Sequence, residues 1–396
     1  MAVAVSNDDV IAFRLRAQHL TERLDEAGLL VAAGACGIQN SPPGSALLAL
    51  QARVHNLSPQ RVDEAVAGDK NLLQSWCMRG SPFFFPTADA PVFTTGVLPP
   101  TEGALRQFIR GAGPLVDRLG LRITQAVELT GAEIGDVLGG RLLALDQLGV
   151  ELAERIAPNL SRGQRDMWEQ EGPHAAGQPV GEAIVHFCIR ILSLQRVVCF
   201  APRDGNTAPF VLTEEWLGNP IPASDPNSAR AALLRRYLHC YGPSTRADFA
   251  AWLGLRAGDT GPWWRLVEDE MTQVEFRGRT WVLSEDLDAL RTSPTPERVR
   301  LLPPHDPYTQ LRDRDTIVAK KHHKHLWKSV GAPGTVLSDG QVIGTWRSRK
   351  SGRKLTMTIK TFDTLTAQAR EPLQAEAQQI ATLRGAASLD VAFDSH

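Results

Sequence analysis

The stretch AALLRRYLHCYGPSTRADFAAWLG, residues 231–254, has the pattern of two helices joined by a tight turn. Gly242 ends the first helix, since glycine readily adopts the conformation that closes a helix. Thr245 and Asp248 have the spacing of a capping box, which marks the start of the second helix. Gly254 is the expected end of that helix. The stretch therefore predicts a helix-turn-helix.

A third helix and a hairpin follow this pair. GPWWRLVEDEM, residues 261–271, predicts a helix, and TQVEFRGRTWVLS, residues 272–284, predicts a hairpin that turns at Arg277-Gly278. A helix-turn-helix followed by a β wing is the winged-helix arrangement found in many DNA-binding proteins. This part of the chain therefore predicts one complete winged-helix unit.

A less regular copy of the unit comes earlier in the chain. LTGAEIGDVL offers Thr130 and Glu133 as a capping box at the start of a helix. Residues 180–195 have the pattern of a helix that is apolar on most faces, and residues 196–212 predict two short strands joined by a loop. The first hundred residues have room for a third, degenerate unit, with RGSPFFFPTAD in the place of its wing.

Both ends of the chain carry further regular patterns. The C-terminal residues 334–360 predict strands with hairpin turns at Asp339-Gly340 and Ser351-Gly352. Helical periodicity is expected in residues 9–24, 45–54, 60–76 and 368–385.

The expected fold class is α+β, with tandem winged-helix units and a C-terminal region of β-hairpins. The expected segments are an N-terminal winged-helix-like unit with a polar turn at Gln39 (1–100), a second unit (101–225), a third unit (226–296), a basic hairpin region with a closing helix (297–386) and a loose tail (387–396).

The composition predicts a globular protein of the cytoplasm. Hydrophobic residues make up 43% of the 396 residues and charged residues 22%, and no apolar run is long enough to cross a membrane. The N-terminus lacks the basic and apolar segments of a signal peptide. The five cysteines are scattered and odd in number, which favours reduced thiols and excludes a CxxC zinc site.

The charge distribution is asymmetric although the net charge is only −1. Residues 320–360 contain ten Lys or Arg and one acid, Asp339, so this segment carries +9 and the other residues about −10. A basic segment in a nearly neutral protein is typical of a polyanion partner, and the alternative is a solvated face with no partner. The candidate DNA contacts are Lys320, Lys321, Arg347, Arg349, Lys350, Arg353 and Lys354.

Conventional catalytic motifs are absent: the sequence has no GxSxG, no P-loop and no GxGxxG after a strand. The histidines of HHKHLW occupy adjacent positions with no carboxylate close in sequence, so we expect no metal site there. His305 and Asp306 lie on a proline-rich turn, where Asp306 has either a site role or a role in capping backbone amides. No cofactor or metal is expected.

The stretch CGIQNSPPG, residues 36–44, places three uncharged polar residues between a glycine and two prolines. It is either a plain polar turn or a rigid platform that presents the side chains of Gln39, Asn40 and Ser41. Arg79, in WCMRGSP, either binds a phosphate or organises the loop at Gln39.

Five motifs in this order resemble one family. They are GIQ, WCMRGSP, YLHCYGPSTRADFAAWLGL, LLPPHDPY with RDR, and DGQVIGTWR. Together they are similar to the AlkZ-like, or YcaQ-like, winged-helix DNA glycosylases, from about residue 10 to residue 386. The resemblance implies three winged-helix units around a concave, basic DNA channel. It also implies removal of N7-alkylated purines, including bulky genotoxin adducts and interstrand crosslinks.

The same resemblance implies a catalytic motif, Gln-x-Gln or Gln-x-Asp, on the turn after the second helix. Gln39 matches its first residue, and Ser41 stands where the second Gln or Asp would be. A serine hydroxyl is a shorter group for positioning water, and Asn40 is the alternative substitute. The family also uses a β-hairpin that contacts DNA near this motif.

The function expected is that of a monomeric, monofunctional DNA glycosylase acting on double-stranded DNA near the nucleoid. Alkylation at N7 makes the purine a good leaving group, so uncharged groups that place a water suffice. The alternatives are a non-catalytic winged-helix regulator or lesion-binding protein, and a scaffold for protein partners. A regulator normally needs a dimer, and the sequence shows no dimerisation helix.

Overall fold

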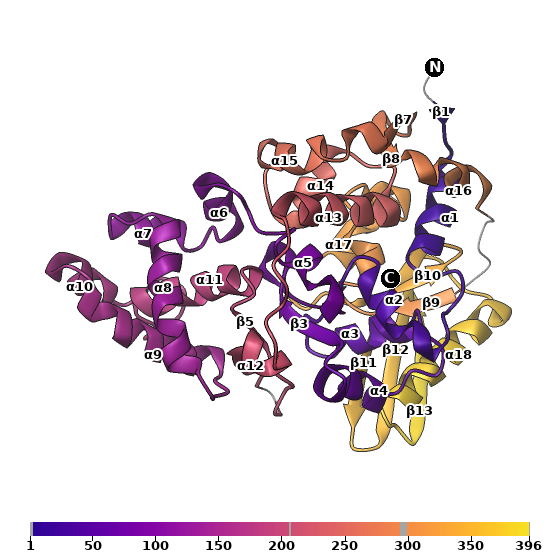
Figure 1. Ribbon diagram of the computed structural model, residues 1–396. Coiled ribbons are helices and arrows are strands. Elements are labelled where there is room, and N and C mark those ends of the chain that lie inside the picture. The colour runs from indigo at the N-terminus through magenta and orange to yellow at the C-terminus, as the bar shows by residue number, and fades with distance from the viewer. Residues whose placement is uncertain (1–2, 206, 294–298, 396) are drawn as a thin grey trace. The chain divides into compact units, whose positions relative to one another are not determined.

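The computed structural model describes residues 3–205, 207–293 and 299–395, which form a mixed α+β architecture (Figure 1). The chain divides into two compact units, each assembled from separate segments. Unit 1 comprises Met1–Val62, Leu234–Phe249 and Val267–His396, and unit 2 comprises Asp63–Leu233 and Ala250–Leu266. The five sequential segments predicted above therefore do not coincide with these units, and the boundary expected at 296/297 lies outside the described residues.

Unit 1 contains a five-stranded sheet in the order β13-β12-β11-β10-β9. Both predicted hairpins are present in it. At the first turn, Asp339 and Gly340 have φ angles of 51° and 80°, as a two-residue hairpin turn requires. At the second, Ser351 pairs with Lys354. The strands are β9 (Val299–Leu302), β10 (Gly334–Ser338), β11 (Gln341–Ser351), β12 (Lys354–Thr361) and β13 (Ser388–Ser395).

Strand β13 corrects the prediction of a loose tail at 387–396. It pairs in parallel with β12 along its whole length. Alternate residues Leu389, Val391 and Phe393 pack against the core that the sheet shares with α18 (Ala367–Leu383). Burial of these alternate apolar residues orders the end of the chain. The sequence alone does not predict this, because the residues are buried only when β12 is beside them.

The core of this sheet also holds a helix from the N-terminal part of the chain. Trp346, Met357 and Ile359 of the sheet and Ile380 of α18 form one buried cluster with Leu48. Leu48 belongs to α3 (Ser45–Gln51), the helix that follows the polar turn at Gln39. The turn is therefore attached to an element with a fixed place in the core.

The rest of unit 1 includes a small sheet in the order β1-β7-β8. Its hairpin turns at Arg277-Gly278, as the sequence predicts, and Val274 and Val282 pack with Phe13 in a second core. The remaining elements are β1 (Val3–Ala4), β2 (Ile38–Gln39), β7 (Met271–Glu275), β8 (Arg279–Leu283), α1 (Asn7–Ala17), α2 (Leu29–Gly34), α4 (Pro59–Asp63), α16 (Leu287–Thr292) and α17 (His323–Leu326).

Unit 2 combines helices with a sheet in which β4, β3, β5 and β6 are neighbours in that order. These elements are β3 (Leu72–Trp76), β4 (Pro82–Pro86), β5 (Val198–Phe200), β6 (Phe210–Leu212), α5 (Ala90–Phe93), α6 (Glu102–Phe108), α7 (Gly113–Arg118), α8 (Ile123–Leu138), α9 (Leu145–Ile156), α10 (Arg162–Trp168), α11 (Val180–Leu194), α12 (Thr213–Leu217) and α15 (Gly261–Arg265).

Two predictions in unit 2 were wrong. Helix α8 begins at Ile123, because the carboxylate of Glu102 accepts hydrogen bonds from two backbone amides at that end. Thr130 therefore lies within the helix, where its hydroxyl donates to the carbonyl of Ala126. The helix expected over 60–76 ends at Gly68, and β3 follows as a fully buried strand beside β4.

The predicted helix-turn-helix elements occur in order as α13 (Pro226–Tyr241) and α14 (Arg246–Leu253), followed by α15 and the β7-β8 hairpin. The cap at Thr245 is confirmed: its hydroxyl accepts from the Asp248 amide at 3.1 Å and donates to the Asp248 carboxylate at 2.6 Å. Both α13 and α14 contribute residues to both units. Within the described residues, no helix is long and apolar enough to span a membrane, and none of the five buried cysteines forms a disulfide.

Candidate active-site turn and nucleic-acid contacts

The polar turn at Gln39 connects the short strand β2 to helix α3. Gln39 is the second residue of β2, and its side chain is buried, with 7% of the residue exposed. Its carbonyl accepts a hydrogen bond from the Ser45 hydroxyl at 3.2 Å. The first residue of α3 therefore holds the backbone of Gln39 in place.

Asn40 stabilises the turn from within. Its side-chain oxygen accepts hydrogen bonds from the amides of Gly44, at 2.9 Å, and Ala46, at 3.4 Å. These contacts cap the N-terminal end of α3, where backbone amides lack helical partners. Ser41 is half-buried, and its hydroxyl has no hydrogen bond to any other described residue. The structure thus gives Asn40 a scaffolding contact, and the chemical roles of Gln39 and Ser41 stay predictions.

Helix α13 supports the segment that leads into the turn. The Cys240 thiol donates to the carbonyl of Ala35 at 3.4 Å. The Tyr241 hydroxyl donates to the carbonyl of Pro307 at 2.9 Å and lies 3.7 Å from the sulfur of Cys36. The YLHCYG motif and the proline-rich HDPY motif therefore meet next to the segment that leads into the turn.

A buried ion pair fixes the other end of α3. The guanidinium of Arg53 binds both carboxylate oxygens of Asp306 at 2.8 and 2.9 Å, and both side chains are at most 1% exposed. Burial lowers the pKa of Arg53, but the charge and hydrogen bonds of Asp306 outweigh this and raise the pKa overall. Asp306 also accepts from the amide of Tyr308 at 2.9 Å. Its observed contacts are structural, which favours the capping alternative over the site role.

A second arginine joins two more motifs. Arg14 of α1 donates to the carbonyls of Gly242, at 3.1 Å, and Pro243, at 2.9 Å, and forms a bidentate pair with Asp313 of the RDR motif. His305, the other residue predicted on the proline-rich turn, is half-buried with a φ of 59°. Its Nδ1 lies 3.5 Å from the side-chain nitrogen of Gln310.

The basic hairpin β11-β12 has two different faces. Trp346 and Ile359 point to the core with α18, so their strand neighbours point outward, because side chains alternate along a strand. The exposed residues of this outer face include Arg347, Arg349, Lys354 and Lys360. Lys350 is on the helix face, where its ammonium donates to the carbonyl of Arg384 at 2.5 Å.

Acids of β13 offset part of this charge. Asp390 lies 3.5 Å from Lys354, and Asp394 is paired in register with Lys360. Arg349 has no ion-pair or hydrogen-bond partner among the described residues, and Arg347 donates to a backbone carbonyl, that of Gly331. Among the described residues, therefore, no acid forms an ion pair with either of these two arginines.

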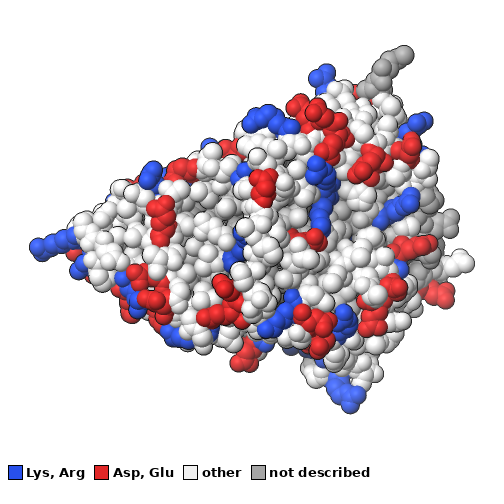
Figure 2. All heavy atoms as spheres, in the orientation of Figure 1, with Lys and Arg blue, Asp and Glu red and all other residues white. Residues whose placement is uncertain are grey.

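The other predicted DNA contacts are also on the surface. Lys320 and Lys321 are exposed on a short 3₁₀ helix, and Arg353 is exposed at the hairpin turn. Beside them the ring of His322 stacks on Phe362 at 3.8 Å. The described residues contain no group of three or more His, Cys, Asp or Glu side chains that could hold a metal ion. Figure 2 shows a face on which basic and acidic side chains are interspersed, in keeping with the small net charge.

Arg79 lies in unit 2, in a left-handed conformation with a φ of 58°. Its guanidinium donates to the carbonyl of Trp252 and lies 5.7 Å from the ring centre of Phe83. These contacts hold the turn after β3 against α14.

Arg190 of α11 was missed by the sequence reading. Its guanidinium lies 5.4 Å from the ring centre of Trp76 and 4.9 Å from that of Phe187. It has no acidic partner among the described residues, its Nε is buried without a hydrogen bond, and burial lowers its pKa. A side chain at Gly80 would lie 3.2 Å from it. A signal in the sequence is that Arg190 is the sole Lys or Arg in a mostly apolar helix.

Known proteins resemble this chain over most of its length. A family model described as DNA glycosylase AlkZ-like matches residues 32–383. An interstrand DNA cross-link repair glycosylase of Streptomyces sahachiroi is 26% identical over 349 residues, which are 85% of this chain and 86% of that protein. The structure of Streptomyces sahachiroi DNA glycosylase AlkZ is similar in fold, with a TM-score of 0.76, 23% identity and coverage of 99% of this chain and 100% of that one. The match over most of its length shows that the chain belongs to the AlkZ-like DNA glycosylase family.

Proposed function

We propose that this protein is a monofunctional DNA glycosylase that hydrolyses the N-glycosidic bond of N7-alkylated purines in duplex DNA. The observation that carries the proposal is the Gln39 turn, whose backbone is fixed by Asn40, Ser45 and the core contacts of α3. The turn lies within the region that matches the family. A carboxamide on such a support is suited to placing a water molecule with little loss of entropy.

The chemistry of the substrate suits an uncharged site. Alkylation at N7 gives the purine a positive charge, so the base leaves without being protonated. The transition state resembles an oxocarbenium ion, and the enzyme must place a water against C1′ and stabilise the developing charge. In this proposal Gln39 positions the water and Ser41 assists. No amine nucleophile is needed, so the DNA strand remains intact after the base leaves.

DNA phosphates are the partners we assign to the unpaired cations. In unit 1 these are Arg347 and Arg349 on the outer face of the hairpin. In unit 2, the guanidinium of Arg190 lies against two aromatic rings, and none of the described acids neutralises it. Guanidinium groups bind phosphate oxygens with directed hydrogen bonds. The relative from Streptomyces sahachiroi is named for cross-link repair, and we extend the proposed substrates to bulky adducts and interstrand crosslinks.

The direct test uses a duplex oligonucleotide with a single N7-methylguanine. Release of the base should leave an abasic site, so strand cleavage should appear only after alkali treatment. Uracil and 8-oxoguanine, whose bases carry no positive charge, should remain. Strand cleavage without alkali, or efficient release of uracil, would contradict the proposed mechanism.

One observation favours a second candidate function, that of a lesion-binding protein without catalysis. Ser41 stands in place of the second Gln or Asp of the family motif, and a hydroxyl reaches less far than either. A protein that binds the alkylated duplex more tightly than the undamaged one, yet releases no base, would establish this alternative.

A further inference from the structure

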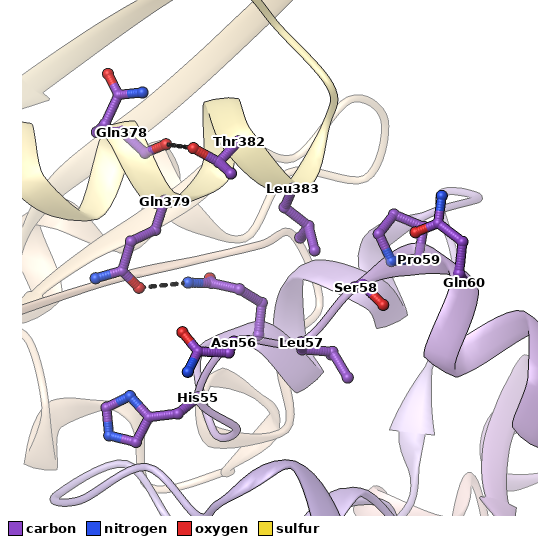
Figure 3. A pocket seen from close by; sticks show the side chains of 11 residues that line it. His55, Asn56, Leu57, Ser58, Pro59, Gln60, Gln378, Gln379, Thr382 and Leu383 are labelled. Atoms are coloured by element: carbon purple, nitrogen blue, oxygen red, sulfur yellow. Dashed lines mark hydrogen bonds between the residues drawn. The ribbon is translucent and has the colours of Figure 1, made fainter.

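A polar cavity of about 570 Å³ lies in unit 1 at the C-terminal end of α3 (Figure 3). Its size is within the range of small-ligand pockets, about 300–1,000 Å³. One wall is the segment after α3, and the other is the last turns of α18. The lining residues are Gln51, His55, Asn56, Leu57, Ser58, Pro59, Gln60, Gln378, Gln379, Thr382 and Leu383.

The lining is unusual in its chemistry. It has five carboxamide side chains and no Lys, Arg, Asp or Glu. Leu57 and Leu383, each 6% exposed, add apolar surface. Figure 3 shows the amide groups of Asn56 and Gln379 on the same side of the cavity as the ring of His55. A charged ligand would find no counter-ion among these residues, so the cavity suits a neutral ligand rich in hydrogen-bonding groups.

Gln51 is a buried residue of this lining. Its side-chain nitrogen donates to the side-chain oxygen of Gln379 at 2.8 Å, the bond drawn at Gln379 in Figure 3. Only 6% of Gln51 is exposed, and its buried side-chain oxygen has no hydrogen-bond partner among the described residues. Reversing both amides would leave the nitrogen of Gln51 unpaired instead. In either orientation one polar atom of a buried carboxamide lacks a hydrogen bond within the described protein, which is costly unless water or a ligand reaches it.

We infer that this cavity binds the edge of a purine base. Glutamine and asparagine present a donor and an acceptor side by side, and this arrangement matches the adjacent acceptor and donor groups on a purine edge. The leucine side chains provide contact for a planar ring. Phosphate and carboxylate ligands are disfavoured because no cation lines the cavity.

A purine can come from two sources. It is either a free base in solution, including one released from DNA, or a base that has left the stack of a bound duplex. The cavity and the Gln39 turn lie at opposite ends of α3, a helix of seven residues. The inference concerns binding alone and does not depend on catalysis.

Saturation-transfer NMR tests the first source, with adenine and 7-methylguanine as free-base probes and glucose as a polar, non-planar comparison. Both purines should bind with a dissociation constant of about 0.1–1 mM, as expected for ligands of this size. A duplex with one unpaired 2-aminopurine tests the second source through its fluorescence.

Three variants decide the outcome. Gln51→Leu preserves the volume of the side chain, and Gln379→Ala truncates an exposed residue of α18. Each should weaken the purine signal at least about tenfold, since a buried polar group loses its partner. Gln374→Ala, an exposed glutamine of α18 outside the cavity, is the control and should leave the signal unchanged.

The two assays separate this inference from the proposed glycosylase function, because neither requires a base to be excised. A signal in either assay that depends on Gln51 and Gln379 supports the inference and identifies the source. The inference is overturned if neither signal depends on these residues, or if glucose binds as well as the purines.

Discussion

Two arginines of this protein, Arg53 and Arg190, are used in opposite ways. Arg53, in unit 1, is covered completely and binds both oxygens of Asp306. Arg190, in unit 2, is half-buried; its guanidinium lies 5.4 Å from the ring centre of Trp76 and 4.9 Å from that of Phe187, and no described acid neutralises it. The first has its counter-ion inside the fold. The second keeps a guanidinium oriented and partly dehydrated, which is what a phosphate-binding group requires.

This difference distinguishes an arginine that stabilises the fold from one that is available to bind a ligand. Removing one partner of a compensated pair leaves an unpaired buried charge, so the loss appears in the free energy of unfolding. Removing an uncompensated cation relieves a desolvation cost, so the loss should appear in ligand binding.

Asp306→Asn should lower the free energy of unfolding by about 3–5 kcal/mol, because Arg53 would remain buried without a counter-ion. Urea denaturation measures this difference. The double variant Arg53→Met with Asp306→Leu removes both charges and should cost less than the single change. If Asp306→Asn changes the stability by less than about 1 kcal/mol, the pair is not the scaffold that its burial indicates.

Gln39→Ala should lower the rate of base release about 10²-fold, a typical loss for a group that positions a reactant. Single-turnover assays on the N7-methylguanine duplex measure the rate. Asn40→Ala is the matched control on the same turn: it removes the helix cap and should lower the stability by about 1 kcal/mol. Full activity of Gln39→Ala would place the chemistry elsewhere.

Arg190→Gln should weaken duplex binding about tenfold at low salt, in line with the loss of a charged hydrogen bond. The slope of log affinity against log salt should fall by about one unit. The melting temperature should stay the same or rise, in contrast to Asp306→Asn. Arg162→Gln removes an exposed arginine of unit 2 and is the control. Equal affinity of both variants would remove Arg190 from the DNA contacts.

The two faces of the basic hairpin offer a smaller test. Arg349 is exposed on the outer face, whereas Lys350 donates to the carbonyl of Arg384 on the helix face. Arg349→Ala should weaken duplex binding several-fold and reduce the salt slope by about one unit. Lys350→Ala should have a weaker effect on both. The reverse order would show that the helix face, not the outer face, meets the DNA.

His239 is an intermediate case, since its half-exposed imidazole is bound to Asp286 at 2.9 Å. The hydrogen bond and charge of Asp286 raise the pKa of His239 above 6.5. This pair should therefore stabilise the fold fully below pH 6.5 and lose its contribution as the pH rises through the raised pKa. The effect should be below about 1 kcal/mol because of solvent screening. Thermal unfolding of His239→Gln should show a flatter pH dependence in that range.

Local chemistry made several elements predictable. The turns at Asp339-Gly340 and Arg277-Gly278 and the Thr245 capping box depend on residues within four positions of each other, and all three are confirmed. The capping box proposed at Thr130 was wrong because a distant carboxylate, that of Glu102, starts α8 earlier. A short-range pattern is reliable only where no distant group competes for the same backbone amides.

The candidate site, too, could be predicted from the sequence only in part. The sequence indicated the Gln39 turn and the family resemblance, but the cap on Asn40 depends on the backbone path of the turn. The resemblance also directed attention to the basic hairpin. It did not distinguish Arg349 from Lys350, because the direction of each side chain depends on which strand face meets α18.

By itself the sequence determined the α+β class, the order of helices and hairpins in the C-terminal half, and the residues of the polar turn. The tertiary structure alone decided that Arg53 meets Asp306, which is 253 positions away, and that no described acid reaches Arg190. Turns and caps are set by the conformations and hydrogen bonds of neighbouring residues. Charge compensation and burial depend on groups that only the folded chain brings together, and these decide which arginine supports the fold and which remains available to an anion.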